Sequence, residues 1–409
     1  AGEQEYVHKR KRVVLESLSS LGINCTTDSV PHIALLASGG GQRAAVGLVG
    51  SLYQMEKEHL LDTLLYLGSV SGSTWSMSSI YSDPQWSDSL DTAVSRLSGP
   101  GVPLEEALAW LGERAKEEHF SLSDVWGVLT SAGIMKQMDL RRLSDEASRN
   151  ATNPYPIYSA IEKHCYSHGP IQGKWFEVSP HEAGFTELGL FISTSLLGST
   201  FQNGELLEEK PEMDMVKLQG VFTEQYGLTV TKRLETNSYL VLPMIMKWEW
   251  GTTGNFLYQY QGEKTSAIVA RFHLTDAGLL INVGYPSFLG EKRDIDLIIA
   301  PEYSAGNMFE VQDYAAEVNK PFPEIDAKIL EERDWPKGCY VLKGKEKEPT
   351  IVYMPLFNRH NCKGLLHTDF FLDVSAQIKT YETNTTNRTC YSKYSSNFYS
   401  QKSQIKAKY

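Results

Sequence analysis

A serine between two small residues stands where an apolar stretch of the chain ends. Ser71 lies in "YLGSVSGSTW" and is followed by Gly72 and Ser73. A serine at a sharp turn from strand to helix exposes its hydroxyl above the sheet edge, and the turn closes only when its neighbours are small. These residue types predict a nucleophile for acyl transfer at Ser71. An ordinary helix cap is the alternative, because Ser69 stands where the GxSxG pattern has its first glycine.

A glycine run earlier in the chain offers the second part of such a site. Residues 38 to 41 read Ser-Gly-Gly-Gly after another short apolar stretch. Acyl transfer needs amide N–H donors aimed at the oxygen that becomes negative, and glycines let a substrate approach the backbone. A phosphate-cradling or purely structural turn is the alternative, although no Walker lysine or GxGxxG accompanies the run. Arg43 follows as a candidate anchor for a substrate phosphate, with a structural ion pair as its alternative.

A base for the serine is the third requirement, and the candidate is a carboxylate. Histidine is the usual base, but none of the ten histidines is an evident choice. His273 precedes Asp276 by three residues in a predicted strand, so its side chain should point to the opposite face. Asp276 stands where that strand meets a turn, and there it can take the serine proton if desolvation raises its basicity. An ordinary turn residue is the alternative.

The surrounding segments predict the elements that must hold these residues. Two short apolar runs are each followed by a small-residue turn and then by helical spacing, which indicates strand, turn and helix. Strands that alternate with helices favour an α/β fold on a largely parallel sheet. The expected strands are 32–37, 64–70, 267–275 and 295–300, and the expected helices are 5–22, 42–57, 74–81 and 103–118.

The composition excludes several classes of protein. The 409 residues, 41% of them hydrophobic, can bury a large core, and the net charge of -11 argues against a general nucleic-acid binder. We interpret the basic residues 9–12 as a solvated helix face, with a contact to anionic lipid as the alternative. The five cysteines are scattered without a CxxC pair, which favours cytosolic thiols over disulfides or zinc. We expect no metal and no cofactor. The longest apolar stretch, 31–52, holds five glycines, so we expect any membrane contact to be peripheral.

Three segments together resemble the cytosolic (group IV) phospholipase A2 family: "IALLASGGGQRAAVGL", "YLGSVSGSTW" and "HLTDAGLLINVGYP". The resemblance continues through "DIDLIIAPEYSAG", "NKPFPEID" and "GCYVLKGKEKEPTIVYMPLFN", and it is most like the gamma subgroup. It implies a patatin-like α/β hydrolase with a central mostly parallel sheet, a nucleophile elbow and a short lid. It also implies a Ser/Asp dyad, with Ser71 as nucleophile, Asp276 as base, Gly40 and Gly41 as oxyanion donors, and Arg43 as phosphate anchor.

The resemblance also sets the expected domain organisation. An N-terminal amphipathic helix in residues 1–30 precedes a single catalytic domain, 31–409, with a lid at about 235–265 and a polar tail at about 383–409. Other members carry a calcium-dependent membrane-binding β-sandwich, for which residues 1–30 are too few, so we expect calcium independence. Some gamma-like members end in a prenylation signal, whereas the last cysteine here is Cys390, so we expect either that the lipid anchor is absent or that the chain is trimmed. In the lid, we expect Trp248, Trp250 and Phe256 to contact lipid, with core packing as the alternative.

These expectations define a calcium-independent phospholipase A2 or lysophospholipase that cleaves fatty-acyl esters of glycerophospholipids through an acyl-enzyme. Water gives hydrolysis of that intermediate, and a lysophospholipid alcohol gives transacylation. The expected partners are a phospholipid membrane surface and lysophospholipids, without nucleic acid, for a cytoplasmic protein bound peripherally to membranes. One alternative is a catalytically weak lipid-binding or storage protein on this fold, motivated by Ser69. The other is an α/β-hydrolase with a histidine-completed triad that acts on soluble esters.

Overall fold

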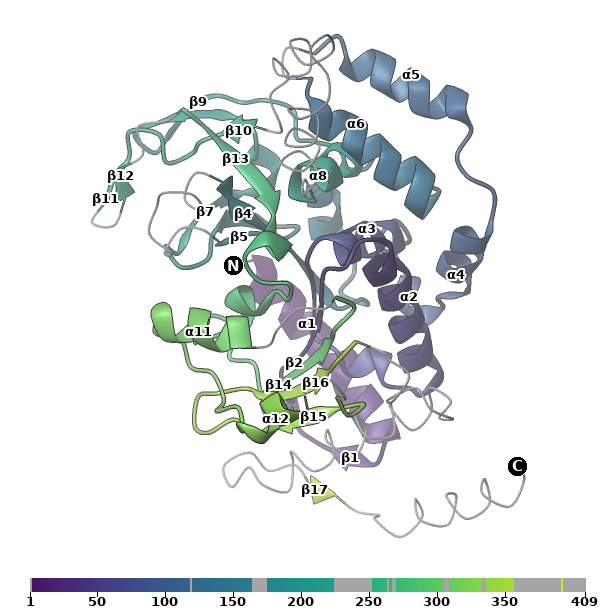
Figure 1. The fold of residues 1–409 in the computed structure, drawn as a ribbon, viewed down its shortest axis with the longest axis vertical. Helices are drawn as coiled ribbons and strands as arrows, with labels where there is room; N and C mark the ends of the chain where they lie inside the picture. Colours follow the sequence, from purple (N-terminus) through teal and green to yellow (C-terminus); the bar gives the residue numbers. More distant parts are fainter. Residues whose placement is uncertain are drawn as a thin grey trace.

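A mixed β-sheet of eleven strands runs through the centre of the protein (Figure 1). The structure is a computed structural model that describes residues 2–117, 120–163, 175–223, 252–262, 265–266, 270–304, 309–332, 336–356 and 391–392. The strands, in order across the sheet, are β15 (Tyr340–Leu342), β16 (Thr350–Met354), β14 (Leu297–Pro301), β2 (Ile33–Ala37), β3 (Tyr66–Ser69), β4 (Tyr155–Glu162), β5 (Trp175–Val178), β6 (Glu182–Phe185) and β7 (Leu190–Ser193). A further strand, β13 (Arg271–Asp276), pairs with both β4 and β10 (Thr252–Gly254).

The centre of the sheet is parallel and its flanks are antiparallel. Strands β16, β14, β2, β3 and β4 run in the same direction. Every residue of β2, β3 and β14 is buried, as expected for parallel strands that are covered on both faces. The pairs from β4 to β7 and the β13–β4 pair are antiparallel. The prediction of a largely parallel sheet therefore holds for the centre, whereas the antiparallel extension was not predicted.

Helices cover the sheet, and one of them is itself buried. All residues of α3 (Gly72–Ile80), which follows β3, lie in the interior. Figure 1 shows α2 (Gln42–Lys57) beside α3, with α5 (Leu104–Arg114) and α6 (Leu122–Val128) beyond them and α11 (Phe309–Glu317) on another side. The other helices are α1 (Gly2–Ser20), α4 (Asp91–Ser98), α8 (Met215–Phe222) and α12 (Lys328–Glu331). Short strand pairs are β1 (Ile23–Asn24) with β17 (Tyr391–Ser392), β8 (Thr200–Gln202) with β9 (Glu205–Glu208), and β11 (Gln261–Gly262) with β12 (Thr265–Ser266).

The predicted strand–turn–helix units are confirmed. The structure has β2 and α2 almost at the predicted residues, because an apolar run, three glycines and helical spacing follow one another there. β3 and α3 repeat the arrangement. The predicted strands at 267–275 and 295–300 occur as β13 and β14, and the predicted helices at 5–22 and 103–118 occur as α1 and α5.

A buried arginine docks the N-terminal helix α1 against the core. Arg10 is 0% exposed, and its guanidinium donates to the carboxylate of Asp62 at 2.9 Å. It also donates to the main-chain carbonyls of Leu64, at 3.1 Å, and Thr152. The prediction that residues 9–12 form a solvated face is therefore wrong for Arg10. A guanidinium has five donors, and this site provides acceptors that offset the cost of removing its charge from water.

A second buried charge cluster joins α1 to strand β5 and to the segment that precedes β14. The guanidinium of Arg293 donates to both carboxylate oxygens of Glu3, at 2.7 and 3.0 Å, and to Glu177 at 2.7 and 3.2 Å. Lys292 adds a 2.7 Å ion pair with Glu177. Burial alone would raise the pKa of Glu177, but the charges of Arg293 and Lys292 lower it to about 2. Glu3 and Arg10 of α1 are thus buried in the interior rather than exposed on the surface.

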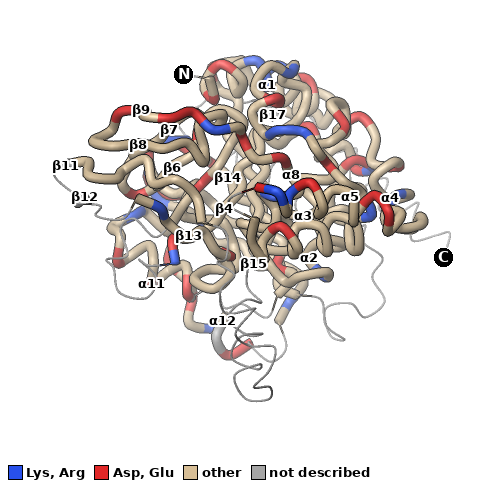
Figure 2. Tube along the Cα trace, turned by 90° about the horizontal axis from the view of Figure 1, so that it is seen from above, with Lys and Arg blue, Asp and Glu red and all other residues tan. Residues whose placement is uncertain are grey.

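Acidic and basic residues are interspersed along the chain in the view of Figure 2. Among the described helices, none combines the length and the apolar character needed to cross a bilayer. Within the described residues, Cys25 and Cys339 are not joined in a disulfide, and the other three cysteines lie outside the described residues. Residues 235–251 of the predicted lid, 235–265, also lie outside the described residues. Of the predicted tail, 383–409, the description covers only Tyr391 and Ser392, which pair with β1.

Replacing Arg10 tests the docking of α1. We expect Arg10→Ala to lower the free energy of unfolding by about 2–4 kcal/mol, because buried carbonyl oxygens lose their donor. The measurement is urea denaturation followed by circular dichroism. The matched control is Arg12→Ala on the exposed side of the same helix, for which we expect a change within about 0.5 kcal/mol. Equal effects of the two substitutions would contradict the docking role.

Candidate active site

Ser71 lies in a strained turn between β3 and α3. Its backbone has φ 55° and ψ -126°, a region that non-glycine residues rarely occupy and that costs on the order of 1–3 kcal/mol. Gly72 follows at a point of close backbone approach, since a Cβ there would lie 2.0 Å from the carbonyl oxygen of Gly41. The side chain of Ser71 is 7% exposed. The turn therefore has the geometry expected of a nucleophile elbow.

Two further serine hydroxyls hold this turn closed. The hydroxyl of Ser73 donates to the carbonyl of Val70 at 2.8 Å and accepts the N–H of Val70 at 3.0 Å. The hydroxyls of Ser69 and Thr74 are hydrogen-bonded to each other at 3.1 Å. Ser69 is fully buried, so its side chain is accommodated in the place of the family's glycine and the turn still closes.

The glycine loop between β2 and α2 lies against the elbow. Gly40 and Gly41 have φ 137° and 61°, which only glycine adopts readily. The N–H of Gly39 donates to the carbonyl of Asn282 at 2.7 Å. The N–H groups of Gly40 and Gly41 have no hydrogen-bond partner among the described residues, and they precede the first turn of α2. Two unpaired donors at a helix N-terminus form a suitable site for a negative oxygen.

The segment that follows β14 packs against the glycine loop. The N–H of Tyr303 donates to the hydroxyl of Ser38 at 2.6 Å, and the phenol of Tyr303 donates to Ser51 in α2 at 2.8 Å. A Cβ at Gly40 would lie 2.7 Å from the carbonyl oxygen of Tyr303. The loop thus has neighbours that fix its backbone, which is a requirement for preorganised N–H donors.

Asp276 ends β13 and is buried beside Ser71. Its side chain is 1% exposed, and Oδ1 accepts the N–H of Gly278 at 2.8 Å. Oδ2 has no hydrogen-bond partner within the described structure, which is unusual for a buried carboxylate. Burial raises the pKa of Asp276 from 3.8 to about 6, and the neighbouring hydroxyl of Ser71 and the N–H of Gly278 limit the rise. A carboxylate with a free oxygen and a raised pKa beside a hydroxyl is suited to accept its proton.

No histidine is among the groups that act on this carboxylate in the described part of the chain. The pKa of Asp276 responds to burial, Ser71 and Gly278. His273 pairs with Thr252 through the backbone, on the half of β13 away from Asp276. The geometry therefore agrees with a two-residue arrangement and gives no support to a histidine-completed triad.

The remaining predicted site residues are Arg43, Phe256, Trp248 and Trp250. Arg43 lies exposed in the first turn of α2, and no ion-pair partner is found for it among the described residues. Phe256 is 4% exposed and packs against Phe185, Phe201 and Phe272, as a core side chain does. Trp248 and Trp250 lie outside the described residues.

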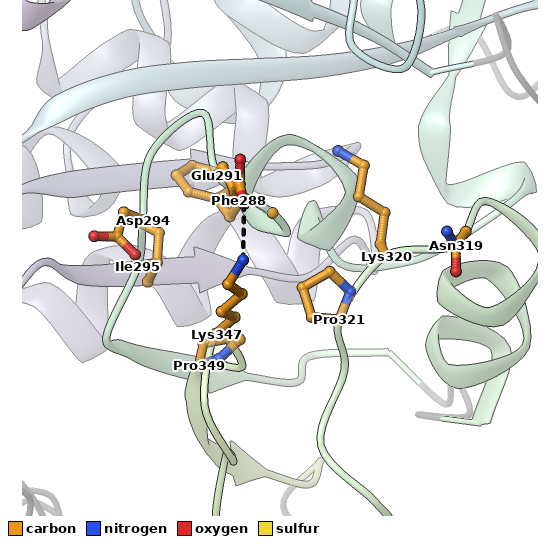
Figure 3. A pocket seen from close by; sticks show the side chains of 10 residues that line it. Phe288, Glu291, Asp294, Ile295, Asn319, Lys320, Pro321, Lys347 and Pro349 are labelled. Carbon is orange, nitrogen blue, oxygen red and sulfur yellow. Dashed lines mark hydrogen bonds and ion pairs between the residues drawn. The ribbon is translucent and has the colours of Figure 1, made fainter.

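A cavity of about 810 Å³ lies away from the serine (Figure 3). Its lining includes Phe288, Ile295 and Lys320, and the ion pair of Glu291 with Lys347, 3.2 Å long, spans it. Ile295 precedes β14, whereas Ser71 follows β3. Because these strands are parallel, the cavity and the serine lie at opposite edges of the sheet. The cavity is therefore not part of the candidate active site. The described residues also contain no cluster of three His, Cys, Asp or Glu side chains suited to a metal ion.

Sequence reasoning missed one residue of this site, Asn282. It lies six positions after Asp276, and its main chain and side chain both reach the glycine loop. No residue pattern in the sequence pointed to it, because its neighbour Gly39 comes from a distant segment. Its only signal was its position within "HLTDAGLLINVGYP", the segment that carries Asp276.

Comparison with known proteins gives matches in sequence and in structure. Residues 112–237 match the family model described as lysophospholipase catalytic domain. The chain is 29% identical to human cytosolic phospholipase A2 gamma, over 93% of this chain and 87% of that protein. It is 30% identical to human cytosolic phospholipase A2 zeta, over 88% of this chain and 52% of that protein.

Solved structures of human GIVD cytosolic phospholipase A2 have the same fold. One matches with a TM-score of 0.73 at 23% identity and covers 87% of this chain and 58% of that chain. Another, in complex with methyl gamma-linolenyl fluorophosphonate, matches with a TM-score of 0.68 at 28% identity and covers 87% of this chain and 54% of that chain. This chain thus spans little more than half the length of these structures. The predicted fold class is confirmed.

Neutralising Asp276 should stabilise the protein. Between about pH 4 and 6 the folded state keeps a proton that the unfolded state has released, so raising the pH through this window lowers the free energy of unfolding. At pH 8 we expect Asp276→Asn to be more stable than the parent by up to about 3 kcal/mol, and the gain should vanish near pH 4. Urea denaturation across this pH range is the measurement. The control, Asp28→Asn at an exposed site, should change stability by less than about 0.5 kcal/mol. A pH-independent effect of Asp276→Asn would contradict the raised pKa.

Proposed function

Because this chain is a relative of the cytosolic phospholipase A2 family and an ester hydrolase of the phospholipase A2 class, we propose that it cleaves fatty-acyl esters of glycerophospholipids through Ser71 and Asp276. One observation carries the proposal: a serine in a strained turn next to a buried carboxylate whose second oxygen has no described partner. A turn residue without a catalytic role would not account for both the strain and the unsatisfied acceptor.

Acylation needs only groups from the three turns that carry Ser71, Asp276 and the glycine loop. The Oγ of Ser71 attacks the ester carbonyl carbon while its proton passes to the carboxylate of Asp276. The carbonyl oxygen becomes negative, and the N–H groups of Gly40 and Gly41 stabilise it. The bond from carbon to the alcohol oxygen then breaks, and Asp276 returns the proton to the departing lysophospholipid. Asp276 is again ionised, and Ser71 carries the acyl chain as an ester.

The second half of the reaction reverses these roles. Water loses a proton to Asp276 as its oxygen bonds to the acyl carbon, the bond from that carbon to Oγ of Ser71 breaks, and the proton goes to Oγ. The products are a fatty acid and the free serine. When a lysophospholipid alcohol replaces water, the same steps give transacylation, so both reactions belong to the proposal.

Further parts of the proposal concern how the substrate is held. Arg43 is exposed at the start of α2, close in the chain to Gly40 and Gly41, and there it can bind the phosphate of a phospholipid. We propose that calcium is not required, since Ser71, Asp276 and main-chain amides supply every group that the steps above use. The substrate class implies action at a membrane surface, and we expect the cytoplasm as the location. The lipid contact expected of Trp248 and Trp250 in the lid remains a prediction.

Substitution of the two proposed catalytic residues tests the function. We expect Ser71→Ala and Asp276→Asn each to lower acyl-chain release by at least about 10³-fold, because nucleophile and base act as a unit. The measurement is release of radiolabelled fatty acid from phosphatidylcholine vesicles. Asp28→Asn serves as the matched control and should keep parental activity. Unchanged release by both site variants would contradict the dyad.

Two additions to this assay address the remaining alternatives. A fluorophosphonate probe should label the parent and fail to label Ser71→Ala, whereas a lipid-storage protein without an activated serine would resist labelling in the parent as well. The release assay repeated with a calcium chelator should give the same rate. Loss of activity in chelator would contradict calcium independence and leave the dyad intact.

A further inference from the structure

Asn282 fixes the glycine loop to the turn that carries Asp276. Its main-chain carbonyl accepts the N–H of Gly39 at 2.7 Å, which ties the segment after β13 to the segment after β2. These segments are far apart in the sequence, and both lie beside Ser71. Asn282 therefore occupies the junction between the proposed oxyanion donors and the proposed base.

The side chain of Asn282 lies in a slot that two glycines leave open. A Cβ at Gly39 would lie 3.1 Å from Oδ1 of Asn282 and 3.0 Å from Cβ of Ser71. A Cβ at Gly278 would lie 3.1 Å from the same Oδ1 and 3.0 Å from Oδ1 of Asp276. Neither glycine has a positive φ, so the backbone does not require glycine at these positions. What the two glycines provide is space for the carboxamide next to both catalytic side chains.

The carboxamide in this slot has unused hydrogen-bonding capacity. Within the described part of the chain, no residue bonds to the side chain of Asn282, although it can donate two hydrogen bonds and accept two. Asn282 is half-buried, whereas Asp276 beside it is fully buried. A carboxamide held in place beside Ser71 and Asp276 is suited to bind a polar atom of a substrate.

We propose that the Asn282 carboxamide binds the oxygen atom that exchanges a proton with Asp276. This oxygen belongs to the departing alcohol during acylation and to the attacking water during deacylation. Because one base serves both steps, both oxygens must occupy the same place beside its carboxylate, and the space that holds the Asn282 carboxamide borders Ser71 and Asp276. The inference rests on the proposed function, since it assigns a substrate-contacting residue to the same reaction.

A fluorophosphonate separates this role from a merely structural one. Labelling by the probe still requires Asp276 to accept the proton of Ser71, and it still uses the oxyanion donors. Its leaving group, however, departs as fluoride and takes no proton. A variant that has lost only the contact to the alcohol or water oxygen should label normally and turn over esters slowly. A variant with a displaced loop should lose both activities together.

The experiment compares Asn282→Leu and Asn282→Ala with the parent. Both variants lack the carboxamide, and they differ in volume, so a shared effect reports the lost hydrogen bond and not a cavity. We expect release of fatty acid from phosphatidylcholine vesicles to fall about 10- to 100-fold in both, as for the loss of a hydrogen bond to a charged or reacting group. We expect the labelling rate to stay within about 3-fold of the parent. Asn150→Ala in an exposed loop is the matched control.

The outcomes distinguish this inference from the proposed function. If Ser71→Ala and Asp276→Asn abolish release but both Asn282 variants retain it, the inference is wrong and the dyad stands. If labelling and release fall together in the Asn282 variants, the residue is structural and the inference is also wrong. If Ser71→Ala and Asp276→Asn release fatty acid like the parent, the proposed function fails and the inference fails with it. If one Asn282 variant does not fold, as judged by thermal unfolding, the other decides.

Discussion

The proposed chemistry depends on a carboxylate that is removed from water and has one oxygen without a hydrogen-bond partner among the described residues. Within the described residues, Asp276 accepts the N–H of Gly278 and lies beside the hydroxyl of Ser71, which fix its position without fully stabilising its charge. Burial raises the pKa of its carboxyl to about 6, so at neutral pH the group is ionised and still basic enough to take a proton. The arrangement costs stability, as does the left-handed backbone of Ser71. Both costs occur where the turn of Ser71 and the turn of Asp276 meet, and the proposed function requires them there.

The sheet is arranged so that three distant segments meet there. The parallel strands β2 and β3 both end at this edge, and each continues through a small-residue turn into a helix. Strand β13 reaches the same edge antiparallel to β4 and delivers Asp276 at its last residue. The contact between Gly41 and Gly72 and the hydrogen bond from Gly39 to Asn282 then fix the three turns to one another. The buried clusters around Arg10 and Arg293 hold α1 against the far side of this framework.

The sequence predicted those parts of the site whose signal is local. The strands and helices flanking residues 38–41 and Ser71 follow from apolar runs broken by small residues, and Asp276 was found at the end of a predicted strand. The features that the sequence did not predict depend on partners that are distant in the chain. From the sequence, Arg10 is expected to be solvated. In the structure it is buried, because the carbonyl groups of Leu64 and Thr152 accept its hydrogen bonds. The antiparallel flank from β5 to β7 and the placement of Asn282 likewise arise from tertiary contacts that have no local pattern.

The most direct test of this account is the pH dependence of the rate at which a fluorophosphonate labels Ser71. Labelling requires an activated serine and involves no lipid surface, so it reports the state of the base alone. We expect the rate to rise with pH through a midpoint near 6, and we expect Asp276→Asn to lose this rise along with most of the rate. A rate that does not change between pH 5 and 8, or a pH profile that survives in Asp276→Asn, would contradict it.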